Sequence, residues 1–279
     1  MRKKVAIQGI EGSFHHQAAH ELLGNTVEVV PCETFNEVFH SVISGKTDYA
    51  VTAVENSLYG SINAVYRLLS NKKIWVQGET YLNIEQFLIG ASKLPLSAVS
   101  KVLSQAPALA QCEVWLEKKV PHASLVETHD TATSVQEVVQ RADEPLAAIA
   151  GKHAAELYGG KIIAGPINDD PHNYTRFFLL SRDIATNIAA NKTSIILKTD
   201  HNPGALYRAL GIFNDAGVNL SKLDSHPISG DRWHYAFYID FELGVGSETG
   251  RSIVEKLESQ NCQVTVLGSY IAGELPKAV

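Results

Sequence analysis

The sequence has few cysteines and none in close spacing. Its three cysteines, Cys32, Cys112 and Cys262, lie far apart, and none belongs to a C-x-x-C motif. This spacing favours reduced thiols in the core or at the surface over a disulfide framework. Reduced thiols are typical of a cytoplasmic protein, so we expect a cytoplasmic location.

Long apolar runs and blocks of positive charge are also missing. No stretch approaches the roughly 18 to 20 apolar residues that span a bilayer, so we expect no membrane contact. The longest basic run, residues 2–4, is followed by an apolar stretch that stops at Gly9, too short for the core of a signal peptide. The formal net charge of −6 disfavours nucleic acid as a partner, because no cluster of Lys and Arg offsets it.

Motifs for nucleotide cofactors are absent as well. Residues 9–13, Gly-Ile-Glu-Gly-Ser, join a predicted strand to a predicted helix but lack the G-x-G-x-x-G spacing. No lysine of the phosphate-binding type follows a glycine run. Two interpretations of the turn stay open: an N-cap at Ser13, or a nest of backbone N–H groups for a carboxylate. We predict no cofactor.

The histidines do not form a recognisable metal motif. His16 and His20 lie one helical turn apart, but the sequence offers no obvious third ligand, so we expect them and His15 to face solvent. Other histidines are scattered through predicted turns and helix starts: His122, His129, His153 and His172. We therefore predict no bound metal.

What the chain does contain is an alternation of strand and helix patterns. With 279 residues, 45% of them hydrophobic and 19% charged, it has the composition of a globular protein with one large or two ordinary domains. The first 180 residues predict an α/β fold. Strands are expected at residues 5–7, 27–30, 49–54, 99–103, 124–126 and 146–150, and helices at 13–23, 34–43, 62–69, 108–117, 131–139 and 152–158.

Two consecutive sets of these units predict two lobes with a cleft between them. We expect lobe one at about residues 1–81 plus 175–182 and lobe two at about 82–174, followed by a polar linker at 183–192. Residues 193–279 change to the order βαββαβ, a ferredoxin-like arrangement.

Hydrogen-bonding side chains lie at the ends of two predicted strands. Residues 173–177, Asn-Tyr-Thr-Arg-Phe, open one strand, and residues 55–57, Glu-Asn-Ser, follow another. Polar groups at strand ends often build sites for small molecules, although the same residues also start strands and cap helices. Ser104, Gln111 and Thr131 lie near the starts of helices in lobe two. Together with Asn56, Ser57 and Thr175 they would supply neutral donors to one cleft, which suits a polyoxygenated anion.

In these residues the chain resembles the prephenate dehydratase family with its C-terminal ACT regulatory domain, over nearly its whole length. The family's N-x-T-R-F motif matches residues 173–177 in full, and E-N-S-x-x-G-S matches residues 55–61. The motif S-H-P-Q-A-L-x-Q-C is kept in part, with residues 105–107 reading Gln-Ala-Pro instead of His-Pro-Gln. Further matches are D-T-A at residues 130–132 and A-A-E-L-Y-G at 154–159.

The resemblance implies a two-lobed catalytic domain, with lobes like those of type II periplasmic binding proteins, and the conversion of prephenate to phenylpyruvate without cofactor or metal. Thr175 would stabilise the departing hydroxyl, and Phe177 would pack near the ring. Arg176 would either hold a substrate carboxylate or pair with Glu55, which would itself be paired or protonated. Substrate carboxylates would be oriented by Asn56, Ser57, Ser104, Gln111 and Thr131.

The resemblance also implies phenylalanine as an effector bound between paired ACT domains, in a homodimer or homotetramer. Gly204, Ala205 and Leu206 match the family's G-A-L, in a turn that starts at Asn202. The family's E-S-R-P becomes Asp224, Ser225, His226 and Pro227, a shorter carboxylate and a switchable imidazole. A purely structural turn and strand end would produce similar residues.

Two other functions remain open on the sequence. Arogenate dehydratase performs the same chemistry on the aminated substrate, and no residue distinguishes the two. A non-catalytic sensor of amino acids or anions would also have two lobes and a cleft.

Overall fold

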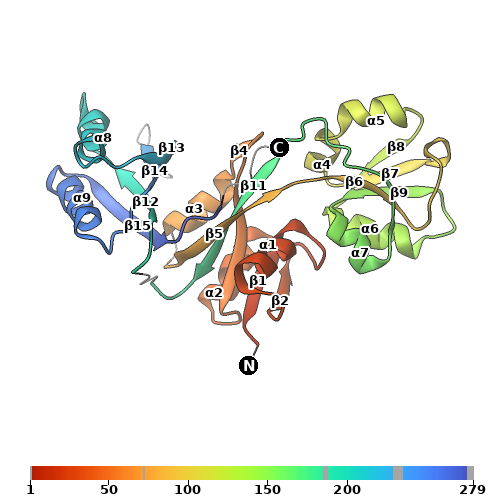
Figure 1. Ribbon diagram of the computed structural model, residues 1–279, viewed down its shortest axis with the longest axis horizontal. Helices are drawn as coiled ribbons and strands as arrows, with labels where there is room; N and C mark the ends of the chain where they lie inside the picture. The colour runs from red at the N-terminus through yellow and green to blue at the C-terminus, as the bar shows by residue number, and fades with distance from the viewer. Residues whose placement is uncertain (1, 72, 185–187, 229–234, 275–279) are drawn as a thin grey trace.

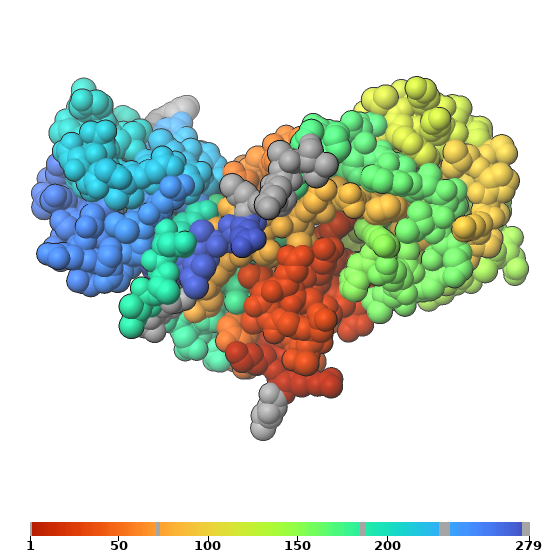
Figure 2. Space-filling model, viewed as in Figure 1, coloured from red at the N-terminus to blue at the C-terminus, as the bar shows by residue number. Residues whose placement is uncertain are grey.

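The computed structural model describes residues 2–71, 73–184, 188–228 and 235–274. Three β-sheets, each with its own helices, lie in a row, with the first lobe between the second lobe and the C-terminal unit (Figures 1 and 2). The predicted α/β class and the two lobes are confirmed. Among the helices in these ranges, none combines the length and apolar character needed to span a bilayer.

The first lobe is built on a sheet with strand order β2-β1-β3-β11-β5, and the short β4 pairs with β3. β1 is parallel to β2 and β3, whereas β11 enters from the second lobe and runs antiparallel to β3 and β5. Helix α2 shows how pattern becomes packing, because Val38, Phe39 and Val42 share one face and are buried. The elements are β1 (Lys4–Gln8), α1 (Phe14–Leu23), β2 (Glu28–Cys32), α2 (Phe35–Ile43), β3 (Tyr49–Asn56), β4 (Gly60–Ser61), α3 (Asn63–Asn71), β5 (Trp75–Asn83) and β11 (Tyr174–Ser181).

The second lobe has the strand order β10-β6-β9-β7-β8. Its central β9 is buried along its whole length, as expected for a strand covered on both faces. The elements are β6 (Phe87–Gly90), the 3₁₀ turn Leu96–Ala98, β7 (Lys101–Ser104), α4 (Ala106–Ala110), α5 (Glu113–Lys119), β8 (Ser124–Glu127), α6 (Thr131–Gln140), β9 (Leu146–Ala150), α7 (Lys152–Tyr158) and β10 (Lys161–Ala164).

The single helix predicted at residues 108–117 is wrong, because the structure has two short helices there. Cys112 leaves the helical conformation, with φ −124° and ψ 14°. The Asp169 carboxylate then accepts hydrogen bonds from the backbone N–H groups of Val114 and Trp115, both at 2.9 Å. This side chain satisfies donors at the start of α5 that a continuous helix would have bonded internally.

The C-terminal unit has the predicted βαββαβ order, with strands arranged β13-β14-β12-β15. Helices α8 and α9 cover one face of this sheet. The other face packs on the first lobe through Ile196, Tyr238 and Tyr270, among others. Gly268 lies so close to the Val76 carbonyl that an added Cβ would collide with it. The elements are β12 (Lys192–Lys198), α8 (Ala205–Asp215), β13 (Leu220–Pro227), β14 (Tyr235–Phe241), α9 (Glu248–Ser259) and β15 (Gln263–Tyr270).

Candidate active site

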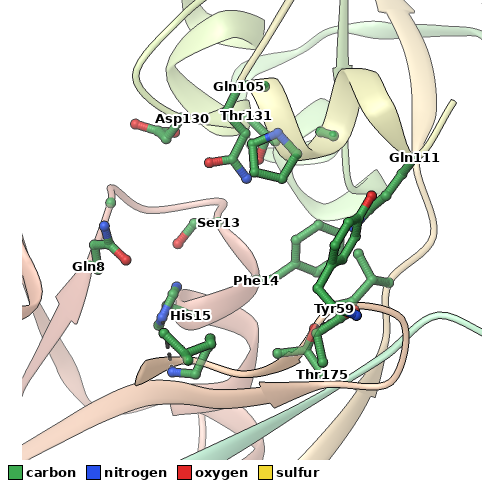
Figure 3. A pocket seen from close by; sticks show the side chains of 18 of the residues that line it. Gln8, Ser13, Phe14, His15, Tyr59, Gln105, Gln111, Asp130, Thr131 and Thr175 are labelled. Atoms are coloured by element: carbon green, nitrogen blue, oxygen red, sulfur yellow. Dashed lines mark hydrogen bonds between the residues drawn. The ribbon is translucent and has the colours of Figure 1, made fainter. Parts of the chain in front are cut away.

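A cavity of about 690 Å³ lies between the two lobes, a size that suits a small-molecule ligand. Its walls include the start of α1 on one side and the starts of α4 and α6 on the other. Figure 3 shows Ser13, His15 and Thr175 of the first lobe around the same hollow as Gln105 and Thr131 of the second.

Strand β11 separates two environments, because successive side chains on a strand point to opposite faces. Thr175 and Phe177 line the cavity. A β-bulge in the pairing with β3 sets Thr175 opposite Asn56 but Phe177 opposite Ala53. The extra residue on β3 brings both Asn56 and Ala53 to the cavity, while Glu55 meets Arg176 instead.

The Asn56 amide fixes the role of the Thr175 hydroxyl. Its Oδ1 accepts hydrogen bonds from the backbone N–H groups of Leu58 and Tyr59, at 3.0 and 3.1 Å, so the orientation of the amide is determined. Its Nδ2 donates to Asn173 Oδ1 at 2.7 Å and to Thr175 Oγ1 at 3.0 Å. Since Thr175 Oγ1 accepts from Asn56, its own hydrogen is available to donate to a ligand in the cavity.

His15 lines the cavity beside Phe177, contrary to the prediction that it faces solvent. Its ring lies edge-on to Phe177 with centroids 5.2 Å apart. Burial lowers the pKa of His15 to about 4, so the ring is neutral at pH 7. Its Nε2 accepts from the Ala53 backbone N–H at 3.2 Å, which leaves the proton on Nδ1 as a donor.

Helix N-termini and neutral donors take the place of basic residues in this cavity. Ser13 caps α1 by accepting from His16 N at 3.3 Å, and Asp130 caps α6 by accepting from Thr133 N at 2.8 Å. The first N–H groups of a helix have no acceptor within the helix, so both ends favour anions. Among the described residues that line the cavity there is no Lys or Arg, and the one carboxylate is that of Asp130.

Gln111 and Thr131, both predicted to bind substrate, do line the cavity. Gln111 Oε1 accepts from Gln86 Nε2 at 3.3 Å. Gln86 is only 2% exposed, and its Oε1 has no hydrogen-bond partner in the described part of the chain. The oxygen itself is buried, so a ligand donor would reach it only after the Gln86 side chain turns toward the cavity.

Arg176 and Glu55, predicted as catalytic, lie outside this cavity, and their placement is a correction. Arg176 is 4% exposed and donates from Nε to Glu79 Oε2 at 2.7 Å and from Nη1 to Asp240 Oδ2 at 2.5 Å. Its Nη1 lies 3.7 Å from Glu55 Oε2. Of the two roles left open for Arg176, the geometry is that of ion pairing, and the pairing joins the first lobe to the C-terminal unit.

Ser57 and Ser104, predicted to bind substrate, also lie outside the cavity lining. Ser57 Oγ donates to the His172 carbonyl and accepts from the Tyr174 N–H, both at 2.9 Å, and so holds the segment before β11. Ser104 is fully buried and donates to the Ile149 carbonyl at 2.7 Å. Their hydroxyls are occupied by the backbone.

The predicted effector residues lie at one end of the C-terminal sheet but on different faces. On β13, Asp224 and His226 face the first lobe, where Asp224 Oδ2 accepts from Ser61 Oγ at 2.6 Å and the His226 ring stacks on Tyr66 at 5.4 Å. Ser225 and Pro227 are exposed. Asn202 and Gly204 lie in the turn before α8, with Gly204 at φ +79°, and Ala205 and Leu206 are the first two residues of the helix.

The prediction that His16 faces solvent is also wrong, because it is only 6% exposed. A third histidine, His153, lies beside it, although no pattern in the sequence indicates this contact. The two residues are 137 positions apart in the sequence, yet His153 Nε2 lies 3.3 Å from His16 Nδ1. The fold alone brings these residues together.

The fold and the cavity define a two-lobed α/β protein with room for a small molecule between its lobes. The family model described as prephenate dehydratase matches residues 5–185. A bifunctional chorismate mutase/prephenate dehydratase of Aquifex aeolicus is 35% identical over 276 residues, 99% of this chain and 74% of that protein. An arogenate dehydratase/prephenate dehydratase 2 of Arabidopsis thaliana is 35% identical over 280 residues, 96% of this chain and 73% of that protein.

Two solved structures are similar over almost the whole chain. The prephenate dehydratase of Arthrobacter aurescens in complex with L-Phe has a TM-score of 0.85 and 27% identity, covering 96% of this chain and 90% of that one. GqqA, described as a novel type of quorum quenching acylase, has a TM-score of 0.85 and 28% identity, covering 97% and 98%. The chain belongs to the prephenate dehydratase family and is a carbon–oxygen lyase.

Proposed function

We propose that this chain converts prephenate to phenylpyruvate, and that Thr175 stabilises the departing ring oxygen. The bond to the leaving carboxylate breaks, and its electron pair enters the ring, which becomes aromatic as CO₂ departs. The ring C–O bond breaks at the same time, and the oxygen leaves as hydroxide, which a proton from hydronium or buffer acid in the solvent converts to water. Hydroxide is a poor leaving group, so a hydrogen bond to this oxygen lowers the barrier.

The observation that carries this proposal is the hydrogen bond that the Thr175 hydroxyl accepts from Asn56. Asn56 occupies the acceptor side of Oγ1 at 3.0 Å, so the hydroxyl donates toward the cavity. A threonine hydroxyl is too weak an acid to give up its proton unaided. We infer hydrogen-bond stabilisation, of a kind that is typically worth about 3 kcal/mol in the transition state.

A lining without Lys or Arg among the described residues suits a decarboxylation. A guanidinium next to the leaving carboxylate would stabilise the ground state that the reaction must destroy. The N-termini of α1 and α6 and the side chains of Gln111 and Thr131 bind anions more weakly and from two sides. We propose that they orient the two carboxylates of prephenate, with Phe177 against the ring.

The test is conversion of prephenate by the purified chain without added cofactor, followed by the absorbance of the phenylpyruvate enolate. Thr175→Val, which keeps the shape but removes the hydroxyl, should lower kcat about 10²–10³-fold with little change in KM. Unchanged turnover in this variant would remove Thr175 from the mechanism. Binding of prephenate without any conversion would favour the non-catalytic sensor.

One observation favours a second substrate, arogenate. Its amino group could donate to Gln86 Oε1, the buried acceptor that lacks a partner among the described residues. Parallel assays with both substrates measure the preference. If Gln86 recognises the amine, Gln86→Leu should lower kcat/KM for arogenate much more than for prephenate.

We further propose that the C-terminal unit is an ACT domain that binds phenylalanine in a homodimer or homotetramer. The similar protein of Arthrobacter aurescens was solved with L-Phe, and its alignment covers 96% of this chain. A path for the signal is available, because Ser61 lines the cavity and donates to Asp224 on β13. Although burial raises the pKa of Asp224, the hydrogen bond from Ser61 and the nearby His226 and Lys222 hold it below its usual value.

Calorimetric titration with phenylalanine, together with the prephenate assay at increasing phenylalanine, tests this regulation. Light scattering or sedimentation measures the oligomeric state. Absence of phenylalanine binding would overturn the regulatory proposal and leave the catalytic one standing.

A further inference from the structure

Three histidines from opposite lobes face one another outside the cavity. His16 and His20 lie one turn apart on α1 of the first lobe, and His153 is the second residue of α7 of the second lobe. One ring nitrogen of each lies within 4.8 Å of the others. The centroid distances are 4.2 Å for His16–His20, 5.1 Å for His16–His153 and 6.3 Å for His20–His153.

A hydrogen bond fixes the His16 ring within this cluster. His16 Nδ1 accepts from the Gly12 backbone N–H at 2.9 Å, and the same nitrogen lies 3.3 Å from His153 Nε2. A metal bound at His16 Nδ1 would displace the Gly12 N–H, because the nitrogen has one lone pair to offer. Imidazole nitrogen in its neutral form is the commonest protein ligand for transition metals.

We propose that His16, His20 and His153 bind one divalent transition-metal ion of the zinc class and thereby join the two lobes. Imidazole nitrogen suits zinc, nickel and copper rather than magnesium or calcium. Metal–nitrogen bonds of about 2.0–2.1 Å need the three nitrogens somewhat closer than now, which small side-chain rotations achieve. His20 and His153 are partly exposed, so the ion can enter and keep water as a further ligand.

The position of the cluster gives the ion a mechanical effect. α1 and α7 are already in close contact, because an added Cβ on Gly151 would collide with the Phe14 ring. The residues at the start of α1, including Ser13 and His15, form one wall of the interlobe cavity. A metal that ties α1 to α7 therefore restricts the separation of the lobes and slows ligand exchange. This consequence for turnover rests on the proposed function, whereas the metal site itself does not.

The binding test uses the untagged full chain, treated with chelator and titrated with Zn²⁺. One equivalent should bind and raise the midpoint of thermal unfolding. His20→Gln and His153→Gln, at partly exposed positions that need not disturb the core, should each weaken Zn²⁺ binding at least about 10-fold and abolish the thermal shift. His122→Gln, at an exposed histidine outside the cluster, serves as the matched control and should behave like the parent.

Two results would overturn the site: equal Zn²⁺ affinity in the parent and both cluster variants, or no stoichiometric binding by the parent. The same titration during the prephenate assay tests the effect on the lobes. Zn²⁺ should lower turnover of the parent, chelator should restore it, and His153→Gln should be insensitive. Stoichiometric binding with unchanged turnover would overturn the clamp, and a parent that never turns over prephenate would refute the proposed function while the binding result stands.

Discussion

Two neighbouring residues of β11 lie in unlike environments. Thr175 borders an open cavity whose described lining contains no Lys or Arg, whereas Arg176 lies in a buried cluster with Glu79, Asp240 and Tyr270. An arginine next to a cleft would be the expected anion binder, but the guanidinium N–H groups of Arg176 already donate to Glu79 and Asp240. The weaker hydroxyl keeps a free hydrogen. Under the proposed mechanism, residual hydrogen-bonding capacity, more than chemical type, decides which group meets the substrate.

The largest effect should come from the buried face. Arg176→Met removes one partner of a buried ion cluster and leaves Glu79 and Asp240 without their guanidinium. We expect the free energy of unfolding to fall by about 3–5 kcal/mol, measured by urea denaturation. Arg176→Lys keeps the charge but not the fork, so it should lose less. Loss of turnover in a fully stable Arg176→Met would break the comparison and make Arg176 catalytic.

Substitutions on the cavity side of β11 should lower the catalytic rate more than the free energy of unfolding. Thr175→Ala should lower kcat about 10²–10³-fold, and Asn56→Ala, which releases the Thr175 hydroxyl, about 10–100-fold. If Asn56 acts through Thr175, the double variant should be no slower than Thr175→Ala alone. Steady-state kinetics on the four chains measure this. Additive losses would mean that Asn56 contacts the substrate independently.

Local patterns in the sequence were sufficient to predict the fold class and many of the elements, but not the strands β4, β5, β6 and β10 or the break between α4 and α5. Buried strands such as residues 146–150 and apolar faces such as that of α2 are short-range features. The predicted site residues divide between the cavity and its surroundings. Asn56, Gln111, Thr131, Thr175 and Phe177 line the cavity, but Glu55, Ser57, Ser104 and Arg176 do not.

The errors have physical causes that lie beyond local pattern. The bulge between β3 and β11 decides that Asn56 faces the cavity and Glu55 does not, and a bulge leaves no clear mark in a single sequence. Glu79 and Asp240, which pair with Arg176, lie on strands that are far from β11 in the sequence. The turn at residues 9–13 did give a signal, the N-cap Ser13 at the start of α1, and His15 lies only two residues further along the helix.

On the cavity side of β11, His15 should make the free energy of unfolding depend on pH. The folded-state pKa of His15, about 4, lies below the usual value of 6.5, so the unfolded chain binds a proton that the folded chain does not. The contribution of His15 to stability is therefore complete above about pH 6.5 and is lost as pH falls toward 4. Between pH 7.5 and 5.5 the loss should be about 1 kcal/mol. In His15→Asn the pH dependence should be shallower by this amount, measured by urea denaturation, and parallel curves would contradict it.

The smallest effect concerns communication between the faces. Asp224→Asn keeps the size of the side chain but weakens its hydrogen bond from Ser61 and its contact with His226, which lies 3.1 Å away. If this contact carries the phenylalanine signal, the coupling between effector and substrate should fall by about 0.5–1 kcal/mol, with basal kcat unchanged. Inhibition curves at several prephenate concentrations measure the coupling. Ser225→Ala, on the exposed face of the same strand, is the matched control, because it leaves the hydrogen bond between Ser61 and Asp224 in place. An equal loss in both variants would place the signal in effector binding itself, and then the two faces of β11 would communicate by another route.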